Sequence, residues 1–234
     1  MSDTPNLGLP FIAAAQAQKH VTHNEALRLL DALVQLTVES ATVAAPPAAP
    51  APGRRWIVPA GATGAWAGWD FNVAAWIDGA WMRLVPRPGW QAWVLDAGHA
   101  AVFTPDGWET GAAAVTPHGA LTRTLLIEAL VPTASGSTVT TPVVIPDRAI
   151  VLGVSTRTVT AVTGATSYDC GIAGEPGKFG GSLGAAPGST NVGVIGPQAF
   201  YADTPVLLTA NGGAFTGGAV RVALHALHPR APLT

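Results

Sequence analysis

Tryptophan is the residue type in this chain whose distribution points most directly to a chemistry. All eight tryptophans lie between residues 56 and 108 of the 234. A tryptophan side chain can fill the core of a small domain, or it can offer a flat apolar face to a sugar ring whose hydroxyl groups bind polar neighbours. The block is therefore either an aromatic core or a carbohydrate-binding surface.

Local context divides the tryptophans between these two roles. Trp76 and Trp81 flank an Asp-Gly turn one position out, so they are predicted to form a close cross-strand pair in a hairpin. Trp108 is expected beside Phe103 across a second turn. Trp66 and Trp69 stand in a glycine-rich loop that is expected to be exposed, and Trp90 and Trp93 follow a pair of prolines. The tryptophans predicted to bind carbohydrate are Trp66, Trp69, Trp90 and Trp93.

Metal binding and nucleophilic catalysis receive little support. The pairs His20/His23 and His225/His228 have the i, i+3 spacing that can hold a metal ion on a helix. The first pair begins before the expected helix, and the second lies on an expected strand, where i and i+3 point to opposite faces. Both pairs are predicted to be surface or interface histidines. Cys170, the only cysteine, is expected to be a small buried residue.

Phosphate binding and sugar cleavage are equally weak interpretations. Residues 171–178 end in Gly-Lys, but the glycine spacing is not that of a P-loop, and Phe179 stands where Ser or Thr is needed. We predict a glycine-rich loop between strands instead. Glycoside cleavage needs a pair of carboxylates, whereas Asp78 and Asp106 lie at predicted turns. We predict no catalytic residue, no metal site and no cofactor, and a polysaccharide-modifying enzyme is the least favoured alternative.

Composition narrows the classes of partner. Charged residues make up 11% of the chain, the net charge is −2, and there are 27 glycines and 20 prolines. A chain without a basic cluster is not expected to bind nucleic acid, whereas a weakly charged surface favours self-association. No signal peptide or membrane span is recognised, so we expect synthesis in the cytoplasm and no membrane insertion.

The elements that must position these residues begin with an N-terminal segment, residues 1–40. A helix is predicted from about His23 to Glu39, with Thr22 as its cap and Glu25 completing a capping box. Its apolar residues form two stripes, which a single helix cannot bury alone, so packing around an oligomer axis is expected. Residues 41–53 are rich in alanine and proline and are predicted to be an extended linker that marks a domain boundary.

Two β regions follow the predicted linker. Residues 54–115 are predicted to form a small tryptophan-rich β-meander. Residues 120–230 lack tryptophan and show period-two patterns that indicate a C-terminal β-sandwich of jelly-roll type. The fold class is thus mainly β with one N-terminal helix. The strands expected in the second region are 121–131, 138–145, 149–162, 167–173, 206–210 and 219–227.

The segment Leu9–Leu27, LPFIAAAQAQKHVTHNEAL, resembles the beginning of the DUF2793 family, which is found in alphaproteobacterial prophages and gene transfer agents. Residues 53–58 and the hairpin 75–81 continue the resemblance over about residues 5–110. Residues 171–174 and 179–184 are similar to the tail of longer members.

The resemblance implies a virion component, a head or tail spike or a spike base, that supports attachment to host surface polysaccharide. The alternative is a purely structural adaptor that joins a fibre to the capsid or tail. The implied partners are other copies of the chain in a trimer or pentamer, capsid or tail proteins, a spike fibre and host capsular polysaccharide. Assembly or anchoring is expected to involve Phe11, Gln16, Gln18, Lys19, His20, Leu27, Leu30 and Val34.

Overall fold

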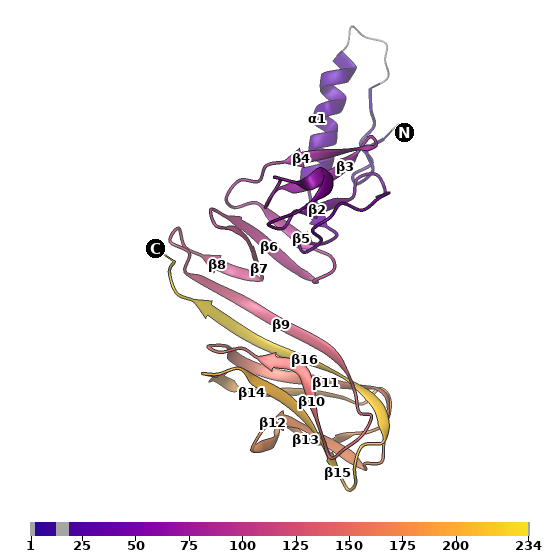
Figure 1. Ribbon diagram of the computed structural model, residues 1–234, viewed down its shortest axis with the longest axis vertical. Helices are drawn as coiled ribbons and strands as arrows, with labels where there is room; N and C mark the ends of the chain where they lie inside the picture. Colours follow the sequence, from indigo (N-terminus) through magenta and orange to yellow (C-terminus); the bar gives the residue numbers. More distant parts are fainter. Residues whose placement is uncertain (1–2, 13–18, 234) are drawn as a thin grey trace. The chain divides into compact units, whose positions relative to one another are not determined.

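The computed structural model describes residues 3–12 and 19–233, and it divides the chain into two compact units between Ala112 and Ala113 (Figure 1). We call Met1–Ala112 unit 1 and Ala113–Thr234 unit 2. The prediction of a mainly β chain with one N-terminal helix is confirmed. The elements of unit 1 are α1 (Lys19–Leu33), β1 (Thr37–Val38), β2 (Arg55–Ile57), the short 3-10 helix η1 (Gly64–Trp66), β3 (Val73–Ile77), β4 (Ala80–Leu84), β5 (Gln91–Val94), β6 (His99–Thr104) and β7 (Gly107–Thr110).

The predicted helix exists, but its bounds were wrong. Thr22 lies inside α1 rather than at its cap, so the expected capping box with Glu25 does not form. The helix ends at Leu33, not Glu39, because Gln35 takes the left-handed conformation (φ 50°), which closes a helix. The next residues form β1, which pairs in parallel with β5. Val38, expected on the helix, is instead buried in the core of unit 1.

Residues 41–53 do not separate two domains, which corrects the predicted linker and the boundary drawn there. The segment is tied into unit 1 by backbone hydrogen bonds from Thr63 N to Ala44 O (2.8 Å) and from Gly53 N to Trp76 O (2.8 Å). The buried guanidinium of Arg55 donates to Ala32 O at the end of α1 (3.0 Å). These bonds join the N-terminal helix to the tryptophan-rich region in one unit. A proline-rich segment is held as an ordered loop when its backbone N–H and C=O groups are hydrogen-bonded to the rest of the fold.

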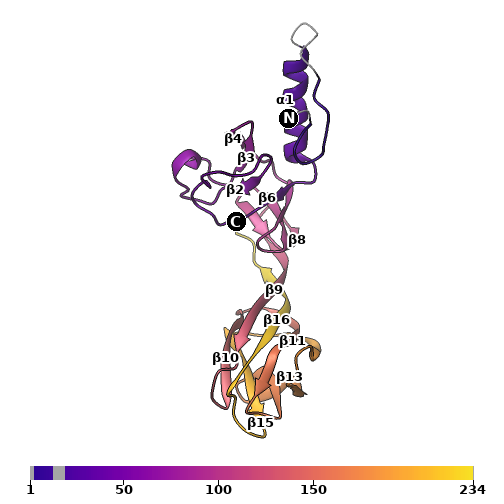
Figure 2. The ribbon, with the colours of Figure 1, turned by 90° about the vertical axis from the view of Figure 1, so that its right-hand side faces the viewer.

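Two sheets build unit 1, with strand orders β1-β5-β6-β7 and β2-β3-β4 (Figures 1 and 2). The hairpin between β3 and β4 has the predicted register, with Trp76 opposite Trp81 and their rings 4.9 Å apart. Phe103 also pairs with Trp108, as predicted, across the turn between β6 and β7. The pattern of turns and alternating residues was thus sufficient to place both pairs.

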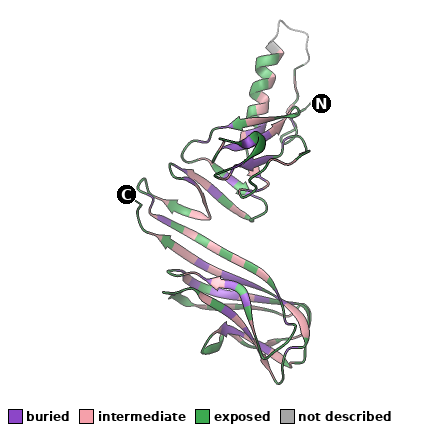
Figure 3. Cartoon of the chain, in the orientation of Figure 1, coloured by how far each residue is buried: buried purple, intermediate pink, exposed green. Residues whose placement is uncertain are grey.

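Unit 2 is a sandwich of two antiparallel sheets around one core, which confirms the prediction of a C-terminal sandwich (Figures 1 and 3). The sheet orders are β10-β15-β12-β13 and β14-β11-β16-β9-β8. Residues 175–184, expected to begin in a glycine-rich loop, form a strand, and 190–199 form another that was not predicted. The strands are β8 (Ala112–Val115), β9 (Leu121–Pro132), β10 (Thr138–Ile145), β11 (Ile150–Thr163), β12 (Ser167–Ile172), β13 (Glu175–Gly184), β14 (Thr190–Ala199), β15 (Thr204–Asn211) and β16 (Gly217–Arg230).

The core of unit 2 follows the predicted alternation. On β16, Val220, Val222 and Leu224 are fully buried, while Arg221 is exposed on the other face. Cys170 is buried as expected, and burial raises the pKa of its thiol to about 12, so the thiolate that reacts as a nucleophile is disfavoured. Among the described residues, no helix is both long and apolar enough to cross a membrane.

Candidate functional site

Trp66 is a core residue, so the expectation that it lies exposed in a carbohydrate-binding loop was wrong. Its side chain is fully buried, and its ring centroid lies 5.9 Å from that of Trp56 and 4.9 Å from that of Trp81. The short 3-10 helix η1 explains why Trp66 is buried, because it directs this side chain inward while the neighbouring glycine and alanine residues remain exposed. No face of this indole is left for a ligand.

Trp69 belongs to the same aromatic cluster. It is half-buried and packs against the core formed around Trp56 and Trp66. Its backbone carbonyl accepts a hydrogen bond from Asn72 Nδ2 (3.0 Å), which fixes the loop. The pair of tryptophans predicted first for sugar binding therefore serves packing, at least over most of its surface.

Trp90 and Trp93 take a different position, at the C-terminal end of α1. Trp93 is 47% exposed and stands on the outer face of β5 together with Gln91, whereas Ala92 and Val94 point into the core. Trp90 is half-buried in the turn that leads into β5. Alternation along one short strand thus brings an indole and an amide to the same surface.

Two shallow hollows adjoin at this surface, and we call them together the Trp90/Trp93 groove. The first has a volume of about 410 Å³ and the second about 310 Å³. Both volumes fall in the range of about 300–1,000 Å³ that is typical of ligand sites. The two hollows share three residues, so the groove is continuous. Its lining is Leu33, Gln35, Leu36, Thr37, Trp90, Gln91, Ala92, Trp93 and Ala100.

The groove offers apolar faces and neutral hydrogen-bonding groups, and none of its lining residues carries a charge. Trp93 pairs across the sheet with Ala100 and Thr37, both small, so neither neighbour is large enough to cover the indole. Gln35 and Gln91 are both exposed and can donate and accept hydrogen bonds. This combination suits a ligand with an apolar ring face and several hydroxyl groups.

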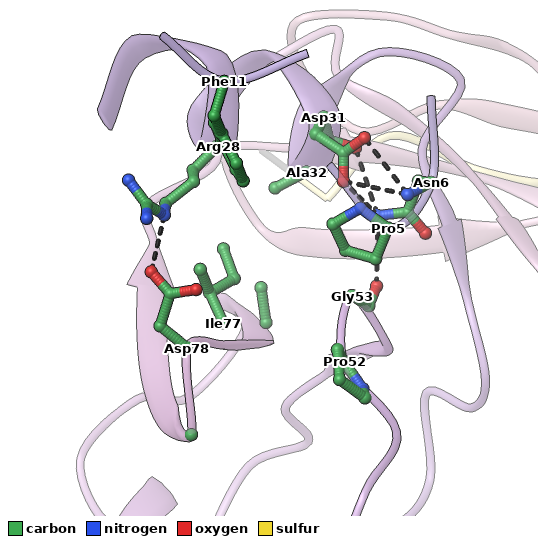
Figure 4. A pocket seen from close by; sticks show the side chains of 12 residues that line it. Pro5, Asn6, Phe11, Arg28, Asp31, Ala32, Pro52, Gly53, Ile77 and Asp78 are labelled. Carbon is green, nitrogen blue, oxygen red and sulfur yellow. Dashed lines mark hydrogen bonds and ion pairs between the residues drawn. The ribbon is translucent and has the colours of Figure 1, made fainter. Parts of the chain in front are cut away.

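A smaller pocket lies where the N-terminal segment meets α1 and the β3–β4 hairpin (Figure 4). Its volume is about 70 Å³, well below the range for a ligand site. Its polar walls are already paired with one another. Arg28 forms an ion pair with Asp78 and lies over the ring of Phe11, with its Cζ 4.7 Å from the ring centroid. We interpret this pocket as the gap left where residues 3–12 pack against α1, and not as a binding site. We call this packing of residues 3–12 on α1 the clamp.

Asp31 closes the same clamp from the helix side. Its carboxylate accepts hydrogen bonds from Leu7 N (2.6 Å) and from Asn6 Nδ2 (2.7 Å). Burial acts to raise the pKa of Asp31, but the hydrogen bonds, including one from Thr4, outweigh it and hold the pKa below its usual value. Residues 3–12 are therefore fastened to α1 by an ionised carboxylate. Sequence reasoning missed Asp31 because its partners lie about 25 residues away.

The residues predicted for assembly have different fates. Phe11 contacts Arg28 within the chain, and Gln16 and Gln18 lie outside the described residues, as does the side chain of Lys19. His20 and Leu27 are half-buried, whereas Leu30 is 50% and Val34 42% exposed. Figure 3 shows that exposed and half-buried residues dominate α1. The helix thus keeps apolar side chains uncovered by its own unit.

The histidines predicted for surfaces or interfaces in unit 2 make structural contacts. His225 Nε2 lies 2.9 Å from Ser155 Oγ, and Arg123 donates to His228 Nδ1 (3.2 Å from its Nε). His228 Nε2 lies 3.1 Å from Asp147 O. Within the part of the chain that the structure describes, no group of three or more His, Cys, Asp or Glu residues is placed to hold a metal ion.

Comparison with known proteins identifies one region. Residues 23–109 match the model of a family described as "Protein of unknown function (DUF2793)". No curated protein matches the chain. Among solved structures, a chain of the cyanophage Pam1 capsid asymmetric unit is similar at 22% sequence identity, over 50% of this chain and 92% of that chain, with a TM-score of 0.32. A TM-score this low does not establish a shared fold.

Proposed function

The chain belongs to the DUF2793 family through residues 23–109, and from this premise we propose that it is a structural component of a phage-like particle that binds host surface polysaccharide through the Trp90/Trp93 groove. The matched region contains every residue that lines the groove. The phage context comes from the family that the N-terminal segment resembles, and the binding site comes from the geometry.

One observation carries the binding part of the proposal. Trp93 exposes about half of its surface, at 47%, within an uncharged hollow edged by two glutamines. Removing the apolar face of an indole from water is favourable, and a sugar ring can cover this face while the glutamines bind its hydroxyl groups. Weak contacts of this kind become strong when several copies of a chain act on one polymer.

Affinity electrophoresis through gels that contain surface polysaccharide from an alphaproteobacterial host tests the proposal. We expect the wild-type chain to be retarded and Trp93→Ala to migrate as it does without polysaccharide. Leu95→Ala is the matched control, because Leu95 is 46% exposed close to Trp93 but does not line the groove. Equal retardation of wild type and Trp93→Ala would contradict the proposal.

A second candidate function is the adaptor that joins a fibre to the particle without binding a ligand. The exposed apolar residues Leu29 and Leu30 of α1, and Val34 directly after it, favour this function. Within α1, His23, Leu27 and Leu30 follow a 4-3 spacing, which places them along one side of the helix as in coiled coils. A wild-type chain that ignores polysaccharide but self-associates through α1 would identify this function instead.

A further inference from the structure

Tyr201 is the most exposed aromatic side chain that the structure describes, with 74% of its surface exposed. It lies between β14 and β15 in unit 2, directly after the buried Phe200. The guanidinium of Arg148 lies over its ring, with Cζ 5.5 Å from the ring centroid. The arrangement keeps the ring exposed to solvent, with a hydrogen-bond donor over one of its two faces.

Arg148 occupies a strained position in the turn that presents it. Ala149 N donates to Pro146 O (3.1 Å), which closes a four-residue turn, and Arg148 has a φ of 67°. Its position in the turn, third of four with positive φ, is that of a type II turn, where glycine is the least strained residue. An arginine here carries backbone strain that a glycine would avoid, and such strain often occurs at functional positions.

The turn is also held firmly in place. Asp203 Oδ1 accepts a hydrogen bond from Asp147 N (2.8 Å), and Phe200 O accepts one from Arg148 N (2.8 Å). Behind the turn, His228 Nε2 donates to Asp147 O, because its Nδ1 accepts from Arg123. Strain in a turn with this many restraints pre-organises the side chains that it displays.

The charges around Tyr201 select the class of ligand. Among the exposed side chains of residues 146–149 and 200–203, two are carboxylates, Asp147 and Asp203, and one is the guanidinium of Arg148, which makes this surface slightly negative. A negative surface disfavours acidic ligands, while carboxylates accept hydrogen bonds from hydroxyl groups and the guanidinium donates them. The ring face, two acceptors and one donor together match a neutral sugar.

We propose that Tyr201, Arg148, Asp147 and Asp203 form a second carbohydrate subsite, which takes a neutral pyranose residue. It rests on the proposed function in that polysaccharide is the ligand, but it lies entirely within unit 2 and shares no residue with the Trp90/Trp93 groove. The subsite then adds a second weak contact to each chain, and weak contacts gain avidity when several copies of the chain act on one polymer.

Fluorine NMR of the full chain labelled with 3-fluorotyrosine tests this subsite directly. The chain has two tyrosines, and the other, Tyr168, is 1% exposed and serves as the internal control. We expect at least one of methyl glucoside, methyl galactoside and methyl mannoside to move the Tyr201 signal saturably, with Tyr168 unmoved and glucuronate without effect. No saturable movement with any neutral sugar, or a response to glucuronate alone, would overturn the proposal.

Arg148→Gly separates ligand binding from a structural role. Glycine relieves the left-handed strain, so the melting temperature should rise, while the sugar affinity measured at Tyr201 should fall about tenfold. Ser182→Gly, which relieves a similar strain (φ 54°) elsewhere in unit 2, should raise the melting temperature without changing that affinity. Unchanged affinity in Arg148→Gly would show the arginine to be structural only.

The groove and the subsite fail separately in these measurements. Trp93→Ala should leave the Tyr201 titration unchanged, because Trp93 lies in the other unit. Loss of gel retardation in Trp93→Ala with an intact Tyr201 titration supports both sites. An intact Tyr201 titration in a chain that polysaccharide never retards would reject the groove alone.

Discussion

Trp66 and Trp93, which lie 27 residues apart in the sequence, have opposite environments in unit 1, one buried and one exposed. Trp66 lies at the centre of an indole cluster, while Trp93 projects from a strand whose alternation leaves it half exposed. Both were candidates for sugar binding by sequence context. The environment in three dimensions, and not the local composition, separates them.

The same substitution at these two positions should therefore give opposite results. Trp66→Ala removes a fully buried indole and should lower the free energy of unfolding by about 3–5 kcal/mol. Trp93→Ala removes an exposed one and should change it by less than about 1 kcal/mol. Chemical denaturation followed by circular dichroism measures both, and equal losses would show that Trp93 is a packing residue.

Asp31 gives a prediction for acid conditions. Its pKa is lowered in the folded chain, so the ionised carboxylate stabilises the clamp. This contribution is present above the ordinary pKa of an aspartate and is lost as the pH falls below it through the lowered value. The difference in melting temperature between wild type and Asp31→Asn should be large at neutral pH and should vanish once the pH has fallen below the lowered pKa of Asp31. A difference that persists at low pH would contradict the role assigned to the carboxylate.

At the scale of elements, alternation made most strands of unit 2 predictable, including β9, β10 and β16 to within a few residues. Strands β13 and β14 escaped prediction because glycine fills several of their positions. At Gly193 a Cβ atom would lie 1.7 Å from Phe179 O. The close approach of β14 to β13 therefore explains why this residue is a glycine. That constraint exists only in the folded unit and leaves no pattern in the sequence.

Only part of the candidate site could be predicted, again because some of its constraints exist only in the folded unit. Trp90 and Trp93 were identified from their residue type, but Gln35, Leu36 and Thr37 were assigned to the helix. The left-handed Gln35 ends α1 early and turns the following residues toward β5. Glycine or asparagine is the usual signal for such an end, and the chain has neither there.

The exposed side of α1 leads to a prediction about association. Leu30→Glu places a charge among apolar residues that we expect another copy of the chain to cover, so it should lower the molar mass in solution. Val43→Glu is the control, because Val43 is exposed in the same unit but outside the helix. Light scattering after size-exclusion chromatography gives the mass, and an unchanged mass in Leu30→Glu would reject α1 as the interface.

At the scale of the whole molecule, the two units have separate hydrophobic cores, and only unit 1 contains tryptophan. Every tryptophan lies in unit 1, so fluorescence excited selectively at tryptophan follows the unfolding of that unit alone. Gly193→Ala should destabilise unit 2 through the clash with Phe179 O and lower its transition in circular dichroism. The fluorescence transition should stay where it is; a parallel shift of both transitions would show that the units unfold together.

The most direct test of the account is the adsorption of whole particles to encapsulated host cells. Particles that carry Trp93→Ala should contain the chain in normal amount, because we propose α1 and not the groove as the assembly surface, yet they should adsorb less than wild-type particles. Leu95→Ala particles should adsorb normally. Undiminished adsorption by Trp93→Ala particles with a normal content of the chain would contradict the claim that this protein attaches the particle to its host through the groove.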